Sequence, residues 1–179
     1  CLKCNPPLPL NIKQPQTVLT HMGAHILYDS TIHASDQPCG FCCRPFPMCH
    51  FVLKRTGDGL AVNRAASHGC MNFVKTFKYK VAPTSSTRSP CSNVPLSCPE
   101  CETTAAAVWH YNLKHHLIHA HPCIPVAKHK DLWELSQSEK VAMQNVWQKV
   151  KDPPKKATKK KPQSTLKILA AHSSWRALM

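Results

Sequence analysis

Residues 98–122, CPECETTAAAVWHYNLKHHLIHAHP, contain the pattern that decides the fold. Two cysteines in C-x-x-C spacing, Cys98 and Cys101, precede a run with helical periodicity that carries His116 and His121. A C-x-x-C turn directs two thiolates to one point, and a helix places two histidines about one turn apart on one face. Four such ligands complete a tetrahedral zinc site. The segment therefore predicts a C2H2-like zinc module.

The helix of this module is expected over Ala105–His119, with Pro122 ending it. Its apolar stripe consists of Val108, Trp109, Leu113 and Leu117. His115 and His119 have x3 spacing and remain alternative ligands. We prefer His116 and His121 because Leu113 then lies three residues before the first histidine, where a zinc finger keeps its small apolar core.

A second module of the same order occurs at the start of the chain. Its predicted zinc ligands are Cys1, Cys4, His21 and His25, with a helix over Gln16–Leu27 that begins near Pro15. The spacers between cysteine and histidine pairs are sixteen residues here and fourteen in the later module, against about twelve in a standard finger. Both modules should therefore have extra loop between the cysteines and the helix.

Between these modules lies a region with cysteines but no cysteine–histidine order. Two strand-like runs, His50–Arg55 and Phe73–Ala82, each follow a cysteine. This arrangement suits a four-cysteine zinc site, for which the first choice is Cys39, Cys42, Cys49 and Cys70. Cys91 competes for one of these positions. Cys43 and Cys123 are expected to be free thiols.

The chain changes character after Cys123. Ser136 and Glu139 form a capping box that opens a helix ending near Val150. A Lys/Pro/Ser/Thr-rich segment follows, with few apolar residues to bury, and it is expected to be disordered. The candidate phosphate-binding side chains are Lys149, Lys151, Lys155, Lys156, Lys159, Lys160 and Lys161.

Composition favours metals over disulfides as the stabilising cross-links. The 179 residues include 11 Cys and 12 His; the cysteine number is odd, and histidines have no role in a disulfide framework. With 16 prolines and 7% aromatic residues, a large conventional core is not expected. The predicted fold is a small zinc-stapled α+β protein. Its expected segments are a C2H2-like module (1–34), a cysteine-rich β module (35–92), a second C2H2-like module (93–124), a capped helix (125–150) and a basic disordered tail (151–179).

Charge and motifs limit the function. The net charge of +14 favours a polyanionic partner. Pro38-Cys39-x-x-Cys42 matches half of the zinc deaminase signature, but the H-x-E half with its proton-carrying glutamate is missing. Four protein ligands leave no open position on zinc, so we expect two or three structural zinc ions and no enzyme. No apolar run is long enough to span a membrane.

The strings HMGAHIL, PCGFC, SPCSNVPLSCPEC, VWHYNL and AHSSW, in this order, resemble a group of Cys/His-rich zinc-finger-like proteins of basidiomycete fungi. The resemblance covers most of the chain and implies metal binding through the two C2H2-like sites. Together with the charge, it leads us to expect a nuclear protein that binds DNA or RNA mainly through phosphate contacts. A zinc-stapled protein-interaction module is the alternative. We expect no small-molecule substrate.

Overall fold

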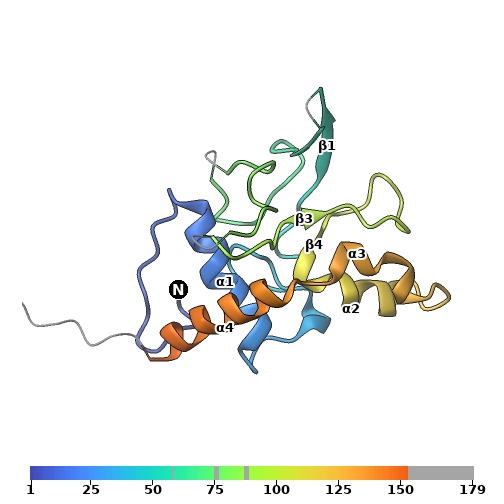
Figure 1. The fold of residues 1–179 in the computed structure, drawn as a ribbon. Helices are drawn as coiled ribbons and strands as arrows, with labels where there is room; N and C mark the ends of the chain where they lie inside the picture. The colour runs from blue at the N-terminus through green and yellow to red at the C-terminus, as the bar shows by residue number, and fades with distance from the viewer. Residues whose placement is uncertain (58, 75–76, 87–88, 153–179) are drawn as a thin grey trace, which may run out of the picture.

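The expectation of a small α+β protein is confirmed. The computed structural model describes residues 1–57, 59–74, 77–86 and 89–152. In this part of the chain, four α-helices accompany two small antiparallel sheets (Figure 1). The disorder expected for the tail lies outside the described residues, as do five of the seven candidate lysines, Lys155, Lys156, Lys159, Lys160 and Lys161.

Helix α1 (Pro15–Tyr28) is the helix expected at Gln16–Leu27. Pro15 occupies the first turn, where its missing N–H leaves no intrahelical bond unmade. One face of the helix, formed by Val18, Leu19 and Ala24, is fully buried. Gly23 also lies on this face: a Cβ at this position would come within 2.9 Å of the Cys91 sulfur. Close packing therefore holds α1 in the protein core.

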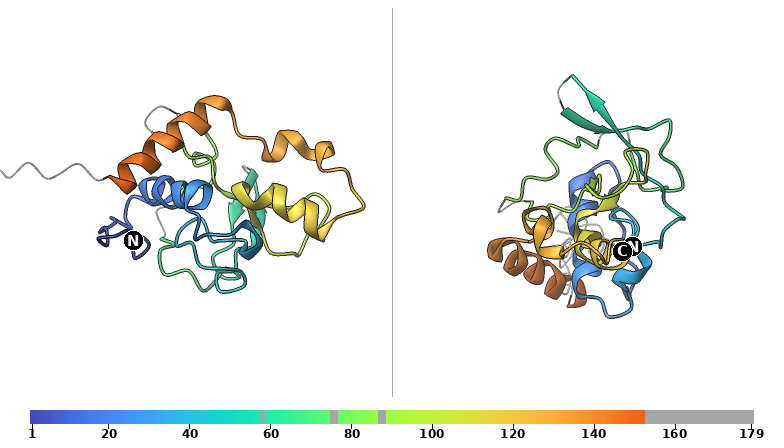
Figure 2. Two further views of the ribbon diagram at one scale, coloured as in Figure 1. Left: turned by 90° about the horizontal axis from the view of Figure 1, so that it is seen from below. Right: turned by 90° about the vertical axis from the view of Figure 1, so that its right-hand side faces the viewer.

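Helix α4 (Gln137–Lys151) lies beside α1, as two views agree (Figures 1 and 2). Ser136 is its N-cap, because the Ser136 hydroxyl accepts a hydrogen bond from the Glu139 backbone N–H at 3.1 Å. The predicted helix start and its Ser136 cap are thus confirmed, whereas the Glu139 carboxylate, the other half of the predicted capping box, accepts hydrogen bonds from Ser92 and Tyr111. Met143 is fully buried against the main core, and the Tyr28 hydroxyl donates to the Lys140 carbonyl.

The sheets are two-stranded and short. Strand β1 (Leu53–Thr56) pairs with β2 (Gly59–Val62) in a hairpin that projects from the body of the molecule (Figure 1). Strand β3 (Pro95–Leu96) pairs with β4 (Val108–Trp109). The strand expected at Phe73–Ala82 is wrong for the described residues of that range, which form turns and loop. Phe73 and Phe77 pack into the main core instead.

Helix α2 (His110–Ala120) begins later than the expected Ala105. Val108 and Trp109 are already paired with β3, and this pairing replaces the first turn that helical periodicity predicted. The chain then passes through the 3₁₀ turn η2 (Val126–His129) into α3 (Lys130–Trp133), and an earlier 3₁₀ turn, η1 (Ala34–Asp36), follows α1. None of the helices in the described ranges is long and apolar enough to cross a membrane.

Two hydrophobic clusters of different size stabilise the fold. The main core is centred on aromatic rings. The ring centroid of Phe41 lies 5.2 Å from that of Phe77 and 5.3 Å from that of Trp109, and both contacts are edge-to-face. The main core contains residues from α1, the cysteine-rich region, β4 and α4, so four of the five predicted segments contribute to one interior. The satellite core is much smaller and consists of Cys98, Val108, Leu113 and Leu117.

Candidate metal centres

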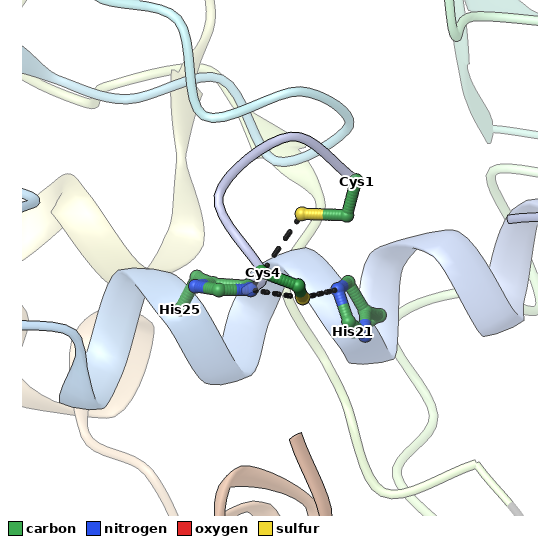
Figure 3. Close-up of side chains that lie close together, drawn as sticks. All are labelled: Cys1, Cys4, His21 and His25. Atoms are coloured by element: carbon green, nitrogen blue, oxygen red, sulfur yellow. Dashed lines mark hydrogen bonds between the residues drawn. The ribbon is translucent and has the colours of Figure 1, made fainter. Parts of the chain in front are cut away.

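The first cluster is formed by α1 and the loop in front of it. His21 and His25 extend from one face of α1, and Cys4 lies between them, with Cys1 above (Figure 3). The Cys4 sulfur is 3.4 Å from the Nε2 atoms of both His21 and His25, and the Cys1 sulfur is 3.6 Å from Nε2 of His25. A zinc tetrahedron with ordinary bond lengths has S···N edges of about 3.5 Å. The four atoms are therefore spaced for a tetrahedral ion.

Surrounding groups keep one histidine of this cluster neutral and orient the other, as cation binding requires. Burial, with smaller contributions from His25 and the N-terminal ammonium, lowers the pKa of His21 to about 4. The His21 ring is therefore neutral at pH 7, and its nitrogen lone pair is available. Nδ1 of His25 lies 2.8 Å from an Asp29 carboxylate oxygen, an outer contact of the kind that orients metal-bound histidines.

The middle cluster contains sulfur ligands alone. Cys42 lies 3.4 Å from Cys49 and 3.8 Å from Cys70, and Cys39 lies 3.7 Å from Cys70, between sulfur atoms. The S···S edge of a zinc tetrahedron is about 3.8 Å. These are the four cysteines of the first-choice set in the sequence prediction.

Backbone turns bring the middle cluster together. The Cys39 carbonyl accepts from the backbone N–H groups of Cys42 and Cys43, which closes the C-x-x-C turn. Gly69 precedes Cys70 with φ of +87°, and a Cβ there would come within 2.0 Å of the Met48 carbonyl oxygen. Only glycine fits this conformation and this approach, which places Cys70 against the segment that carries Cys49.

The four thiols of the middle cluster do not share one protonation state. Burial, followed by hydrogen bonds with the other three cysteines, raises the pKa of Cys39 well above its usual range. Hydrogen bonds from Cys39 and Cys70 lower the pKa of Cys42. Protons thus remain on part of the set because burial disfavours thiolates and the sulfur atoms share hydrogen bonds. A bound cation would instead stabilise every thiolate.

The third cluster joins the Cys98–Cys101 turn to α2. The Cys101 sulfur lies 3.3 Å from His116 Nε2 and 3.2 Å from His121 Nε2, and Cys98 lies 3.5 Å from His121 Nε2. Burial first, then the hydrogen bond with Cys98, raises the pKa of Cys101 to about 11. Nδ1 of His116 is buried and has no hydrogen-bond partner among the described residues.

The remaining candidate ligands lie elsewhere. Cys91 is fully buried in the main core, where its thiol donates to the Leu19 carbonyl, and burial raises its pKa to about 12. Cys43 is buried beside Met22, and burial raises its pKa to about 12 as well. Cys123 is exposed. His115 and His119 lie next to each other on α2 with tilted rings and are not part of the third cluster.

A buried polar network was missed by sequence reasoning. Glu139 of α4 is 4% exposed, and one of its carboxylate oxygens accepts from the Ser92 N–H, the Ser92 hydroxyl and the Tyr111 hydroxyl at 2.6–2.8 Å. Burial raises the pKa of Tyr111, so the phenol keeps its proton and donates a hydrogen bond to Glu139. The capping-box motif predicted only a helix start for this glutamate. Its internal contacts join α4 to the chain before β3 and to α2.

Several polar side chains of α1 and α2 are engaged in contacts within the protein. Gln16 donates to the Cys91 carbonyl, Asn112 donates to the Pro38 carbonyl, and His110 contacts the Ser92 hydroxyl. The Lys114 ammonium lies 4.7 Å above the Trp133 ring. These polar groups are thus already used in contacts within the protein. Lys149 and Lys151, by contrast, are exposed at the end of α4.

No protein-family model, curated protein or solved structure matches this chain. The likeness to the fungal group therefore stays a prediction.

Proposed function

We propose that the three clusters bind three structural zinc ions and that the protein is a zinc-stapled binding protein. The observation that carries this proposal is the grouping of four Cys or His ligand atoms, all within 4.8 Å of one another, at three separate places. Thiolate and imidazole ligands in tetrahedral spacing suit zinc. Four protein ligands complete the coordination, so each ion cross-links the chain and none is left open for a substrate.

Metal content tests this proposal directly. Mass spectrometry of the reduced protein under native conditions should find three zinc ions per chain. Cluster cysteines should react with a thiol reagent only after chelation, whereas exposed Cys123 should react at once. Few free thiols together with no metal would mean disulfides and would overturn the proposal.

The proposed partner is a nucleic acid bound through its phosphates. Residues 35–92 contain eight Lys or Arg and two Asp or Glu, a net charge of +6. Lys54 and Arg55 are exposed on β1, in the projecting hairpin. Lys149 and Lys151 begin the lysine-rich run at the far end of α4. Basic groups at separate places suit an extended polyanion better than a compact anion, and a nuclear location would accompany this role.

The salt dependence of binding tests whether the partner is a nucleic acid. Deleting residues 149–161 should weaken binding of a labelled DNA or RNA duplex between 50 and 200 mM salt. It should also reduce the slope of log K against log salt by about 0.9 for every phosphate that the deleted lysines neutralise. The paired variant Lys54→Ala/Arg55→Ala should do the same to a smaller extent. Lys128→Ala is the matched control, because Lys128 is already paired with Glu100 at 2.8 Å. An unchanged slope in the deletion variant would remove the tail from the mechanism.

A protein partner is the second candidate, favoured by the internal use of Gln16 and Asn112. Absence of nucleic-acid binding at 50 mM salt, with three zinc ions in place, would favour it over the nucleic acid.

A further inference from the structure

The histidine pair that the third cluster leaves unused lies on the same helix as the cluster ligands. His115 and His119 are one turn apart on α2, and their ring centroids are 4.0 Å apart with an interplanar angle of 33°. The corresponding pairs within the metal clusters, His21–His25 and His116–His121, are 5.0 and 5.3 Å apart. The surface pair is therefore at least as close as the pairs that face a metal position.

The pair is also separate from the third cluster. Successive residues on a helix point about 100° apart, so the side chain of His115 cannot share the metal position of His116. His115 is half-buried and His119 is exposed, so the pair borders solvent. Nδ1 of His115 is buried without a hydrogen-bond partner in the described part of the chain. The described residues therefore leave the hydrogen-bonding capacity of this nitrogen unused.

Two imidazoles at i and i+4 on a helix are a known chelating arrangement for late transition-metal ions. Neutral imidazole binds zinc, nickel and copper, and affinity for the same site rises toward Cu²⁺ in the divalent series. Two protein ligands leave the other coordination positions to water. Such an ion exchanges with solution, unlike an ion enclosed by four ligands.

We propose that His115 and His119 form an exchangeable surface site for a divalent late transition-metal ion. The site goes beyond the three structural clusters. It rests on the proposed function in one respect, because α2 must be folded to present the pair. The test therefore starts from protein whose zinc content has been measured, so that empty clusters are recognised before the fourth site is probed.

Nickel is the probe, because Ni²⁺ binds imidazole without oxidising thiols. Calorimetric titration of the zinc-loaded protein should give one Ni²⁺ per chain, with no zinc released as followed by mass spectrometry. The variant His119→Ala should weaken Ni²⁺ binding at least tenfold. His119 is exposed, so this change should leave the zinc content and the helical circular dichroism signal unaltered.

Two further variants keep the assignment falsifiable. His33→Ala removes another exposed histidine and should leave Ni²⁺ affinity unchanged, and Cys123→Ser should do likewise. Bound Ni²⁺ should also raise the melting temperature of the wild type and not of His119→Ala, because a ligand held by the folded helix stabilises it. Equal Ni²⁺ affinity in wild type and His119→Ala would overturn the site, as would a loss of binding in Cys123→Ser with His119 intact.

Discussion

The first and third clusters have the same ligand order but different support. In the first, α1 is buried by Val18, Leu19 and Met22 in the main core, and His25 is held by Asp29. In the third, the C-terminal part of α2 rests on a satellite core that includes the ligand Cys98 itself, and His116 lacks an outer partner in the described residues. Equal ligand sets therefore do not mean equal dependence on the metal. Removal of the ion should unfold the third module, whereas the first module should stay largely folded.

The largest expected effect is a direct test of this difference. Cys98→Ala should remove the third ion and with it stabilisation on the order of 10 kcal/mol, so that amide protection in Leu113–Ala120 disappears. Cys4→Ala should leave α1 protected, because its apolar face stays covered by α4. Hydrogen exchange measured by NMR on both variants makes the comparison. Persistent protection of α2 in Cys98→Ala would mean that the satellite core is sufficient without metal.

The reverse perturbation acts on the main core. Phe41→Ala empties the centre of the aromatic cluster and should reduce the free energy of unfolding by about 3–5 kcal/mol. Protection of α1 should fall more than protection of the C-terminal turn of α2. Denaturant titration gives the size of the loss, and hydrogen exchange gives its location. Equal loss in both helices would contradict the division into two cores.

Acid should weaken metal binding at the third cluster through the Cys101 thiol, whereas the His21 ring of the first cluster should not respond. Because the pKa of Cys101 is raised to about 11, this thiol keeps its proton from pH 6 to 8 without metal, and the ion must displace it. The pKa of His21, lowered to about 4, keeps that ring neutral over the same range. Zinc affinity should therefore fall as pH falls, about tenfold per pH unit for each displaced proton. Competition with a chromophoric chelator measures it, and affinity independent of pH would be inconsistent with protonated thiols.

The smallest expected effect concerns the outer contact of the first cluster. Asp29→Ala removes the carboxylate that orients His25 and should lower zinc affinity of the first cluster by about 10–100-fold, bringing it closer to the third. Asp36→Ala is the control, since Asp36 lies in η1 and outside the clusters. Chelator competition on both variants resolves the change. If Asp29→Ala has no effect, the contact between His25 and Asp29 does not contribute to the zinc affinity of the first cluster.

The grouping of Cys and His side chains into three clusters was the feature that the sequence predicted best. Ligand spacing is a local property, and the C-x-x-C turns and helical histidines carry it within a few tens of residues. The strand expected at Phe73–Ala82 failed for the described residues because Phe73 and Phe77 pack into a core made by distant segments, which no local alternation reveals. The role of Glu139 was unreadable for the same reason: its partners Ser92 and Tyr111 lie 47 and 28 positions away.

The packing of α1 against α4 has a consequence for synthesis on the ribosome. Tyr28 and its partner Lys140 are 112 positions apart, so at 5–20 residues per second α1 is made roughly 6 to 22 seconds before the helix that covers it. During that interval the ligands Cys1, Cys4, His21 and His25 are already present, while the apolar face of α1 is still uncovered. Metal capture at this stage would fix the loop before α1, whereas the apolar face of α1 would stay open to chaperones until α4 emerges.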